Sequence, residues 1–309
     1  MRQDERVETI AAVSSIAADL GVPCRVDEPL APHTTMGVGG PAPCFLEPPS
    51  APALAALVRE LAGSRIGFRV LGAGSNVIVD ERGLATPVIS MASLHGEPRR
   101  EGDLVTAPAG TLLPRLVRQM ASSGLGGFEF LEGIPGSVGG ALVMNAGAGG
   151  QWIGDVTVEV QAITPAGELE TIRPRREEFR YRGSFVTDRG LVAASATLRG
   201  VPDDPGAIRE RVRLSRAHRV ATQPLSERSS GCIFKNPDRG EPAGALLDRL
   251  GLKGTSAGGA AVSEKHANFI VNRGGTFGDI LRLVETMRER ARREAGVDLQ
   301  LEVMIWRDE

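Results

Sequence analysis

The sequence predicts a protein that mixes α-helices and β-strands in about two domains. The chain has 309 residues, and a domain usually holds roughly 100–200 residues. Apolar residues recur at helical spacing in some segments and alternate with polar residues in others,. The stretch "GVPDDPG" at residues 200–206 has the turn-forming composition of a domain boundary,. We therefore expect one domain over residues 1–200 and a second over residues 201–309.

Apolar periodicity and capping residues predict the helices in order. A first amphipathic helix covers residues 5–20, with Val7, Ile10, Val13, Ile16, Ala17 and Leu20 on its apolar side and Gly21 after its end,. The strongest helix covers residues 277–294, because Thr276 can cap it and Asp279 follows three residues later. Further helices are expected at residues 51–62 (capped by Ser50), 112–122, 207–219 and in "EPAGALLDRLG",.

The strands are predicted from short apolar or alternating runs. The segment "RIGFRVLGAGSNVIVDERG" gives a strand, a glycine turn and a second strand,. Residues 155–198 are β-rich, and residues 268–272 form a strand. In the last predicted strand, Leu299, Leu301, Val303 and Ile305 face one side, whereas Gln300, Glu302, Met304 and Trp306 face the other,.

Composition excludes several classes of protein. The net charge is −2, so no broad basic field for nucleic acid is expected. Three cysteines and four scattered histidines indicate neither a disulfide framework nor a zinc site,. No signal peptide or membrane span is expected. We expect a soluble, cytoplasmic protein with no membrane partner.

Glycine is unusually frequent: 39 of 309 residues, about 13% against a usual ~7%. Ten of these glycines fall within residues 124–150, and a smaller cluster is "LGAGSN" at residues 71–76. Because glycine lets the backbone approach a ligand closely, two such loops suggest a diphosphate held from two sides. The alternative is tight turns in a β-domain.

The loop "LGAGSN" does not have the form of a Rossmann dinucleotide site. The strand "VIVD", and not a helix, follows "LGAGSN", whereas that site requires a strand, a turn and a helix. In the second loop, Ser137 precedes a short helix, "VGGALVMN". Its hydroxyl and free N–H groups would suit an anion.

These loops form part of a longer series of motifs. The series comprises "TTMGVGGPA" (34–42), "VLGAGSNVIV" (70–79), "EGIPGSVGGALVMNAGA" (132–148), "YRGSF" (181–185), "SGCIFKNP" (230–237), "AVSEKHANFIVN" (261–272) and "LEV" (301–303). In this order, the chain beyond residue 30 resembles the UDP-N-acetylenolpyruvoylglucosamine reductase (MurB) family.

The resemblance implies an α+β fold and a bound flavin. An FAD-binding domain of the vanillyl-alcohol-oxidase (PCMH) type, in two lobes, would precede a C-terminal α+β substrate domain. FAD would be held tightly but non-covalently, and NADPH would supply the hydride. The residues implied for the FAD pyrophosphate are Gly72, Gly74, Ser75 and Asn76 in one loop and Gly136, Ser137 and Gly139 in the other.

The reaction implied is reduction of UDP-N-acetylglucosamine enolpyruvate to UDP-N-acetylmuramate, a peptidoglycan precursor. The reduced flavin gives a hydride to C3, and an acid gives a proton to C2. By family position, Arg182 contacts the carboxylate and Glu302 assists stabilisation of the enol. Tyr181 and Asn236 would contact the substrate.

Cys232 is a departure, because the family usually has serine as the acid. An ordinary thiol is largely protonated at neutral pH and can donate a proton, so we expect Cys232 to keep the role. A local shift could instead bring in Ser229 or Ser230, or an inert cysteine could mark a weakened enzyme. Arg182 as a surface arginine and Glu302 as a solvated glutamate are the non-catalytic alternatives.

Two other functions stay open at this point. One is a flavin oxidase of a small alcohol or lactone, and the other is a non-catalytic flavoprotein or UDP-sugar sensor. Tyr181 is the single tyrosine of the chain, which implies the family class that lacks an inserted, tyrosine-bearing substrate loop. We expect a monomer or a weak dimer.

Overall fold

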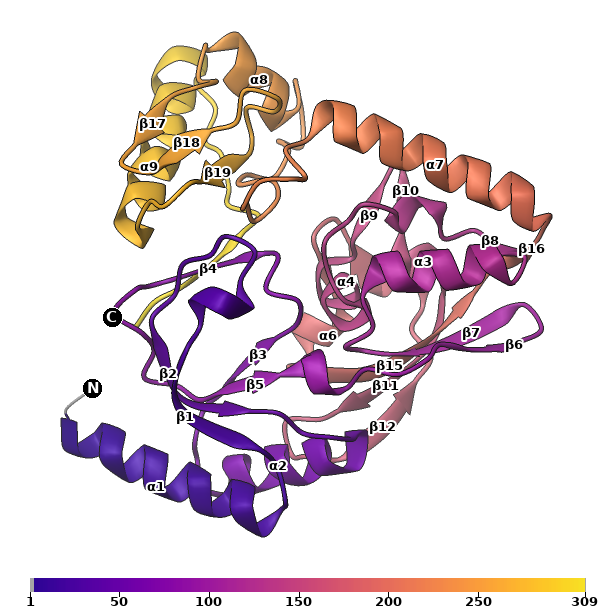
Figure 1. The fold of residues 1–309 in the computed structure, drawn as a ribbon, viewed down its shortest axis with the longest axis vertical. Helices are drawn as coiled ribbons and strands as arrows, with labels where there is room; N and C mark the ends of the chain where they lie inside the picture. The colour runs from indigo at the N-terminus through magenta and orange to yellow at the C-terminus, as the bar shows by residue number, and fades with distance from the viewer. Residues whose placement is uncertain (1–2, 309) are drawn as a thin grey trace. The chain divides into compact units, whose positions relative to one another are not determined.

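A computed structural model describes residues 3–308. The chain divides into two compact units. Unit 1 consists of Met1–Glu28, Ala42–Ala73 and Ala85–Arg216, and unit 2 consists of Pro29–Pro41, Gly74–Leu84 and Ala217–Glu309. Both units combine helices with strands (Figure 1), which agrees with the predicted α+β class. The predicted domain boundary between residues 200 and 201 stays a prediction.

The larger sheet of unit 1 has five antiparallel strands. Their order is β12 (Leu169–Ile172), β11 (Thr157–Ile163), β15 (Val192–Arg199), β7 (Leu104–Pro108) and β6 (Arg99–Glu101). Three of these strands lie in the segment 155–198 that alternation predicted to be β-rich, or extend just beyond its end. The remaining short elements of unit 1 are the pairs β9 (Gly147–Ala148) with β10 (Gln151–Trp152), β13 (Phe179–Arg180) with β14 (Gly183–Ser184) and β8 (Leu125–Gly126) with β16 (Val201–Pro202), and the 3₁₀ turns Met91–Ser93, Glu129–Leu131 and Arg176–Glu178.

Helices cover both faces of this sheet. Val160 packs with α3 (Leu113–Ser122) and α4 (Val138–Met144), whereas Ile163 packs with α2 (Ala51–Gly63). Figure 1 shows α3 and α4 on one side of the sheet and α2 on the other. The alternation along β11 therefore divides the core of unit 1 into two clusters. Two single-turn helices, α5 (Ile153–Val156) and α6 (Phe185–Asp188), also belong to this unit.

A second, four-stranded sheet packs against α1 (Gln3–Asp19) and α2. Its order is β1 (Cys24–Pro29), β2 (Pro41–Leu46), β5 (Val88–Ser90) and β3 (Arg69–Leu71). Ser50 caps α2 as predicted, accepting a hydrogen bond from the Ala53 amide. The prediction that Val7 lies on the buried side of α1 is wrong. Val7 is 61% exposed, because only the part of α1 from Ile10 onward packs against this core.

Unit 2 is built around α9 (Phe277–Ala295). The helix begins with the predicted capping box of Thr276 and Asp279 and ends at Gly296, whose φ is +67°. It packs with α8 (Ala243–Arg249) and with the antiparallel strands β17 (Ser256–Ala257), β18 (Ala260–Val262) and β19 (Ile270–Asn272).

Two early segments of the chain belong to unit 2. Met36, Val38 and Ile78 are buried in the same core cluster as Ile280 of α9. In addition, β4 (Val77–Val79) pairs in parallel with β20 (Met304–Trp306). The 3₁₀ turn Ala31–His33 also lies in these segments, and α7 (Pro205–Thr222) continues from unit 1 into unit 2.

The last predicted strand is only partly formed. Regular pairing covers Met304–Trp306, and Leu301 makes an isolated bridge to Phe234. Exposure differs within one predicted side of this strand. Trp306 is 3% exposed, although Met304 on the same side is 47% exposed.

Candidate functional site

The loop 71–76 joins β3 to β4, so a strand follows it and the exclusion of a Rossmann site is confirmed,. Gly74 has φ +64°, and a Cβ atom there would lie 1.9 Å from the His33 carbonyl oxygen. The Thr35 amide donates to the Gly74 carbonyl at 3.0 Å. The backbone of unit 2 is therefore so close at this point that only glycine fits.

The second loop leads into α4, with Ser137 as the N-cap. The Ser137 hydroxyl accepts a hydrogen bond from the Gly140 amide at 3.4 Å. The Val138 amide donates to the Thr111 carbonyl at 2.9 Å, and the Gly139 amide donates to the Ala109 carbonyl at 2.8 Å. The expectation of free N–H groups here is thus wrong, because the neighbouring backbone already accepts from them.

The two glycine loops meet within unit 1. A Cβ atom on Gly72 would lie 3.0 Å from Ser137 Oγ. This distance is shorter than most contacts that Cβ atoms make in proteins. At Gly139, a Cβ atom would lie 2.9 Å from that of Ala109, so this glycine also serves packing. Gly72 and Ser137 are thus neighbours, and their role toward a diphosphate stays a prediction.

Two buried polar atoms beside the second loop are left without hydrogen-bond partners among the residues that the structure describes. They are Thr111 Oγ1 and Glu132 Oε2. The other carboxylate oxygen of Glu132 pairs with Arg216 Nη1 at 3.3 Å. Since buried polar groups are normally satisfied, these two atoms fit a bound group that has both acceptor and donor atoms.

Arg182 occupies a strained position in a tight turn of unit 1. Tyr181 and Arg182 form the two-residue connection between β13 and β14, and Arg182 has φ +56°. That conformation favours glycine or asparagine. An arginine here therefore points to a role of its side chain.

The aromatic rings around Arg182 shape its surroundings. Its guanidinium carbon lies 5.1 Å from the Tyr181 ring centroid and 6.0 Å from that of Trp152. The two rings meet edge to face at 5.9 Å. Trp152 was not predicted from the sequence; the presence of only two tryptophans in the chain was the signal that could have drawn attention to it.

In unit 2, Cys232 and Glu302 lie on neighbouring segments. The Glu302 amide donates to the Ile233 carbonyl at 2.8 Å. The Asn76 side chain in turn donates to the Glu302 carbonyl at 3.1 Å. Asn76, Cys232 and Glu302 come from three distant parts of the sequence, and this backbone network brings them together.

Asn268 fixes the segment that carries Cys232, and the sequence did not single it out. It is 1% exposed, and its side-chain amide bonds both the amide and the carbonyl of Phe234, at 2.9 and 2.8 Å. An asparagine at the start of the apolar strand "NFIVN" was the available signal. Ser230 nearby is 1% exposed, and its Oγ has no hydrogen-bond partner in the described part of the chain.

Asn236 is exposed and caps α8. Its side-chain oxygen accepts a hydrogen bond from the Ala243 amide at 3.1 Å. Its contact with substrate stays a prediction, as do those of Ser75 and Gly136 with the cofactor. Arg182 and Tyr181 belong to unit 1, whereas Cys232, Asn236 and Glu302 belong to unit 2.

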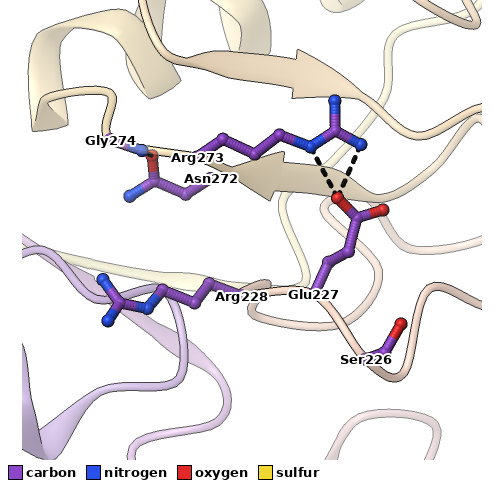
Figure 2. Close-up of a pocket in the computed structure, with 6 residues that line it drawn as sticks. All are labelled: Ser226, Glu227, Arg228, Asn272, Arg273 and Gly274. Atoms are coloured by element: carbon purple, nitrogen blue, oxygen red, sulfur yellow. Dashed lines mark hydrogen bonds and ion pairs between the residues drawn. The ribbon is translucent and has the colours of Figure 1, made fainter.

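An open pocket of about 430 Å³ lies in unit 2 and is lined by Ser226, Glu227, Arg228, Asn272, Arg273 and Gly274. Figure 2 shows the Arg273 guanidinium paired with Glu227, at 2.6 Å, while Arg228 points the other way. The Asn272 side chain has a structural hydrogen bond, because its amide nitrogen donates to the Met36 carbonyl at 2.9 Å. The charged groups diverge, so this pocket does not form an anion site.

Two negative findings concern residues 3–308. They contain no group of three metal-ligating side chains placed to hold an ion. Nor do they contain a helix that is both long and apolar enough to cross a membrane.

Comparisons with known proteins agree with this geometry. The profile of the UDP-N-acetylenolpyruvoylglucosamine reductase C-terminal domain matches residues 223–306, and an FAD-binding-domain profile matches residues 42–173. The UDP-N-acetylenolpyruvoylglucosamine reductase of Desulfosudis oleivorans is 42% identical over 90% of this chain and 93% of its own length. The chain belongs to the UDP-N-acetylenolpyruvoylglucosamine reductase family.

Other members of the UDP-N-acetylenolpyruvoylglucosamine reductase family support the same assignment. The enzyme of Moorella thermoacetica is 38% identical over 97% of this chain and 99% of its own length. The crystal structure of the Thermus caldophilus enzyme (MurB) superposes with a TM-score of 0.78 at 34% identity, covering 93% of this chain and 99% of that one. This reductase is thus an FAD-dependent flavoprotein, as the resemblance implied.

The glycine loops and the unpartnered atoms fit FAD. Gly72 and Ser137 bring two loops within contact of each other, and Thr111 Oγ1 can donate to a phosphate or flavin oxygen. Glu132 Oε2 can accept from a hydroxyl or N–H group of the cofactor. The residues of unit 1 therefore suit a group with both kinds of atom.

Proposed function

We propose that this reductase reduces UDP-N-acetylglucosamine enolpyruvate to UDP-N-acetylmuramate, with Cys232 as the acid that protonates C2. The observation that carries the proposal is the hydrogen bond of 2.8 Å from the Glu302 amide to the Ile233 carbonyl. It puts the only two titratable side chains assigned to the reaction in unit 2 on neighbouring segments. When bound, FAD supplies a hydride to C3 of the enolpyruvyl group, with NADPH as the source of electrons.

Arg182 holds the enolpyruvyl carboxylate in this proposal. Addition of a hydride to C3 leaves negative charge at C2 that spreads into the carboxylate. A guanidinium can bind both carboxylate oxygens at once, and its interaction strengthens as this charge develops. The rings of Tyr181 and Trp152, at 5.1 and 6.0 Å from the guanidinium carbon, limit its orientations.

Cys232 supplies the proton that completes the reaction. The Sγ–H proton moves to C2, the enolate double bond between C2 and the carboxylate carbon becomes a single bond as the carboxylate re-forms, and the thiolate then takes a proton from water. Glu302 assists stabilisation of the enol from the neighbouring segment. Hydrogen bonds from its backbone to Ile233 and from the Asn76 side chain to its backbone hold this segment in place. Asn268 holds the following residue, Phe234, on both its amide and its carbonyl, which orients the segment.

The deciding experiment measures NADPH oxidation by the purified, yellow protein with and without UDP-N-acetylglucosamine enolpyruvate. We expect substrate-dependent NADPH oxidation with UDP-N-acetylmuramate as product. Rapid NADPH oxidation by oxygen alone would favour an oxidase. No turnover with either would favour a flavoprotein or UDP-sugar sensor.

The proposal also covers the cellular location and the oligomeric state of the protein. All three cysteines are free, so we place the protein in the reducing cytoplasm. We also propose a monomer or weak dimer, which size-exclusion chromatography with light scattering would test.

A further inference from the structure

Two cysteines outside the proposed site lie on adjacent strands of unit 1. Cys24 is the first residue of β1, which forms an edge of the four-stranded sheet, and Cys44 lies in the neighbouring β2. Both are free thiols. Neither has a role in the reaction proposed above.

Two contacts fix the register of β1 against β2. The Glu47 amide donates to the Pro23 carbonyl at 3.0 Å. The guanidinium carbon of Arg25 lies 4.9 Å from the ring centroid of Phe45. Residue numbers thus rise along β1 where they fall along β2, so the two strands are antiparallel.

This register places Cys24 and Cys44 on the same face of the sheet. Residue 23 faces 47 and residue 25 faces 45, so residues 24 and 44 are diagonal neighbours with side chains on one side. The Cα atoms of such diagonal neighbours are about 7–8 Å apart. The two sulfur atoms therefore need only side-chain rotation and a small strand adjustment to approach bonding distance.

The two thiols differ in their access to solvent. Cys44 is fully buried beneath α1, with its sulfur 4.0 Å from the Ile10 carbonyl oxygen. Burial, with the neighbouring Cys24 as the next cause, raises the pKa of Cys44 to about 12. Cys24 is only half-buried at the sheet edge. A soluble oxidant thus reaches Cys24 first.

We propose that Cys24 and Cys44 form a reversible intramolecular disulfide when the protein meets a peroxide. Hydrogen peroxide transfers one oxygen to Cys24, giving a sulfenic acid and water. The Cys44 sulfur then attacks the Cys24 sulfur, the S–S bond forms, and a second water leaves with the thiol proton. Two thiols are oxidised and one peroxide is reduced to two waters, and a dithiol reductant reverses the change.

Peptide mapping tests this proposal directly on the FAD-loaded, wild-type protein. Trypsin separates the three cysteines into peptides 7–25, 26–59 and 229–235. After hydrogen peroxide and alkylation, we expect peptides 7–25 and 26–59 to be joined, and dithiothreitol to release them. Formation should be faster at pH 9 than at pH 7, because the second step uses the Cys44 thiolate.

Matched variants control the assignment. Cys24→Ser and Cys44→Ala should each abolish the joined peptide, whereas Cys232→Ser should leave it intact. The proposal is overturned if Cys44 in the wild-type protein remains fully open to alkylation after unfolding, at peroxide doses that oxidise Cys24. Joining of peptide 7–25 to 229–235 instead of 26–59 would also overturn it. Both readings come from the wild type, so they do not depend on the folding of a variant.

Discussion

The Glu302 amide donates a hydrogen bond to the Ile233 carbonyl at 2.8 Å, which ties the segment that carries Cys232 to the C-terminal segment. The two residues are far apart in the sequence, and both belong to unit 2. Since Asn76 also bonds the Glu302 carbonyl, three segments converge here. The predictions for Cys232 depend on this arrangement.

Cys232→Ala is expected to slow reoxidation of the reduced flavin by substrate about 10²–10⁴-fold, the usual contribution of a general acid. Flavin reduction by NADPH should be unaffected, because it does not use the acid. Stopped-flow absorbance separates the two half-reactions. Cys232→Ser should restore much of the rate, and a Cys232→Ala protein whose flavin is reoxidised by substrate at the wild-type rate would exclude Cys232 as the acid.

Arg182→Lys is expected to lower kcat/KM for the UDP-sugar roughly 10–100-fold, the loss of one charge-assisted hydrogen bond of about 1.5–3 kcal/mol. A lysine keeps the charge but cannot bind both carboxylate oxygens. Arg180→Lys is the matched control and should have little effect, because Arg180 lies in the same hairpin but pairs with Asp188 of α6. Equal losses in the two variants would indicate a structural role for the hairpin.

Gly72→Ala is expected to weaken FAD binding about tenfold, because an added Cβ would lie 3.0 Å from Ser137 Oγ and displace this hydroxyl from its position. Fluorescence titration of the apoprotein with FAD measures the Kd. Gly67→Ala serves as the control, since its Cβ meets nothing within 4 Å. Unchanged FAD affinity in Gly72→Ala would remove this contact from the cofactor site.

Thr276→Ala is expected to lower the free energy of unfolding by about 1 kcal/mol, the typical value of a lost N-cap. The Thr276 hydroxyl accepts from the Asp279 amide at 3.1 Å at the start of α9. Thr276→Ser keeps the hydroxyl and should stay close to wild type in urea unfolding. A Thr276→Ala protein as stable as wild type would show that tertiary packing alone holds this end of α9.

The Asp279 carboxylate predicts a pH dependence of stability. Hydrogen bonds from the Thr276 backbone, and then from its side chain, lower the pKa of Asp279 below its usual value. The folded pKa is therefore below the unfolded one of about 3.9, so the stabilisation is complete above that value and is lost as pH falls through the folded pKa. The stability difference between wild type and Asp279→Asn, measured by urea unfolding, should shrink between pH 6 and pH 3. A difference that stays constant over this range would contradict the assignment.

The sequence alone predicted the local elements that depend on near neighbours. Ser50 and Thr276 cap helices where their spacing indicated, because a cap involves atoms only three residues apart. The strand after "LGAGSN" was predicted from its own apolar run, "VIVD", which is also a local signal. The resemblance of seven ordered motifs also sufficed to indicate the reductase family.

The tertiary structure decided which segments meet. Met36 and Ile78 join the core of α9, and the free N–H groups expected after Ser137 are bonded to Thr111 and Ala109 carbonyls from another segment. Cys232, Asn268, Glu302 and Asn76 converge only through long-range backbone contacts. Local periodicity carries no information on such contacts, because they depend on which buried surfaces complement each other after the chain has folded.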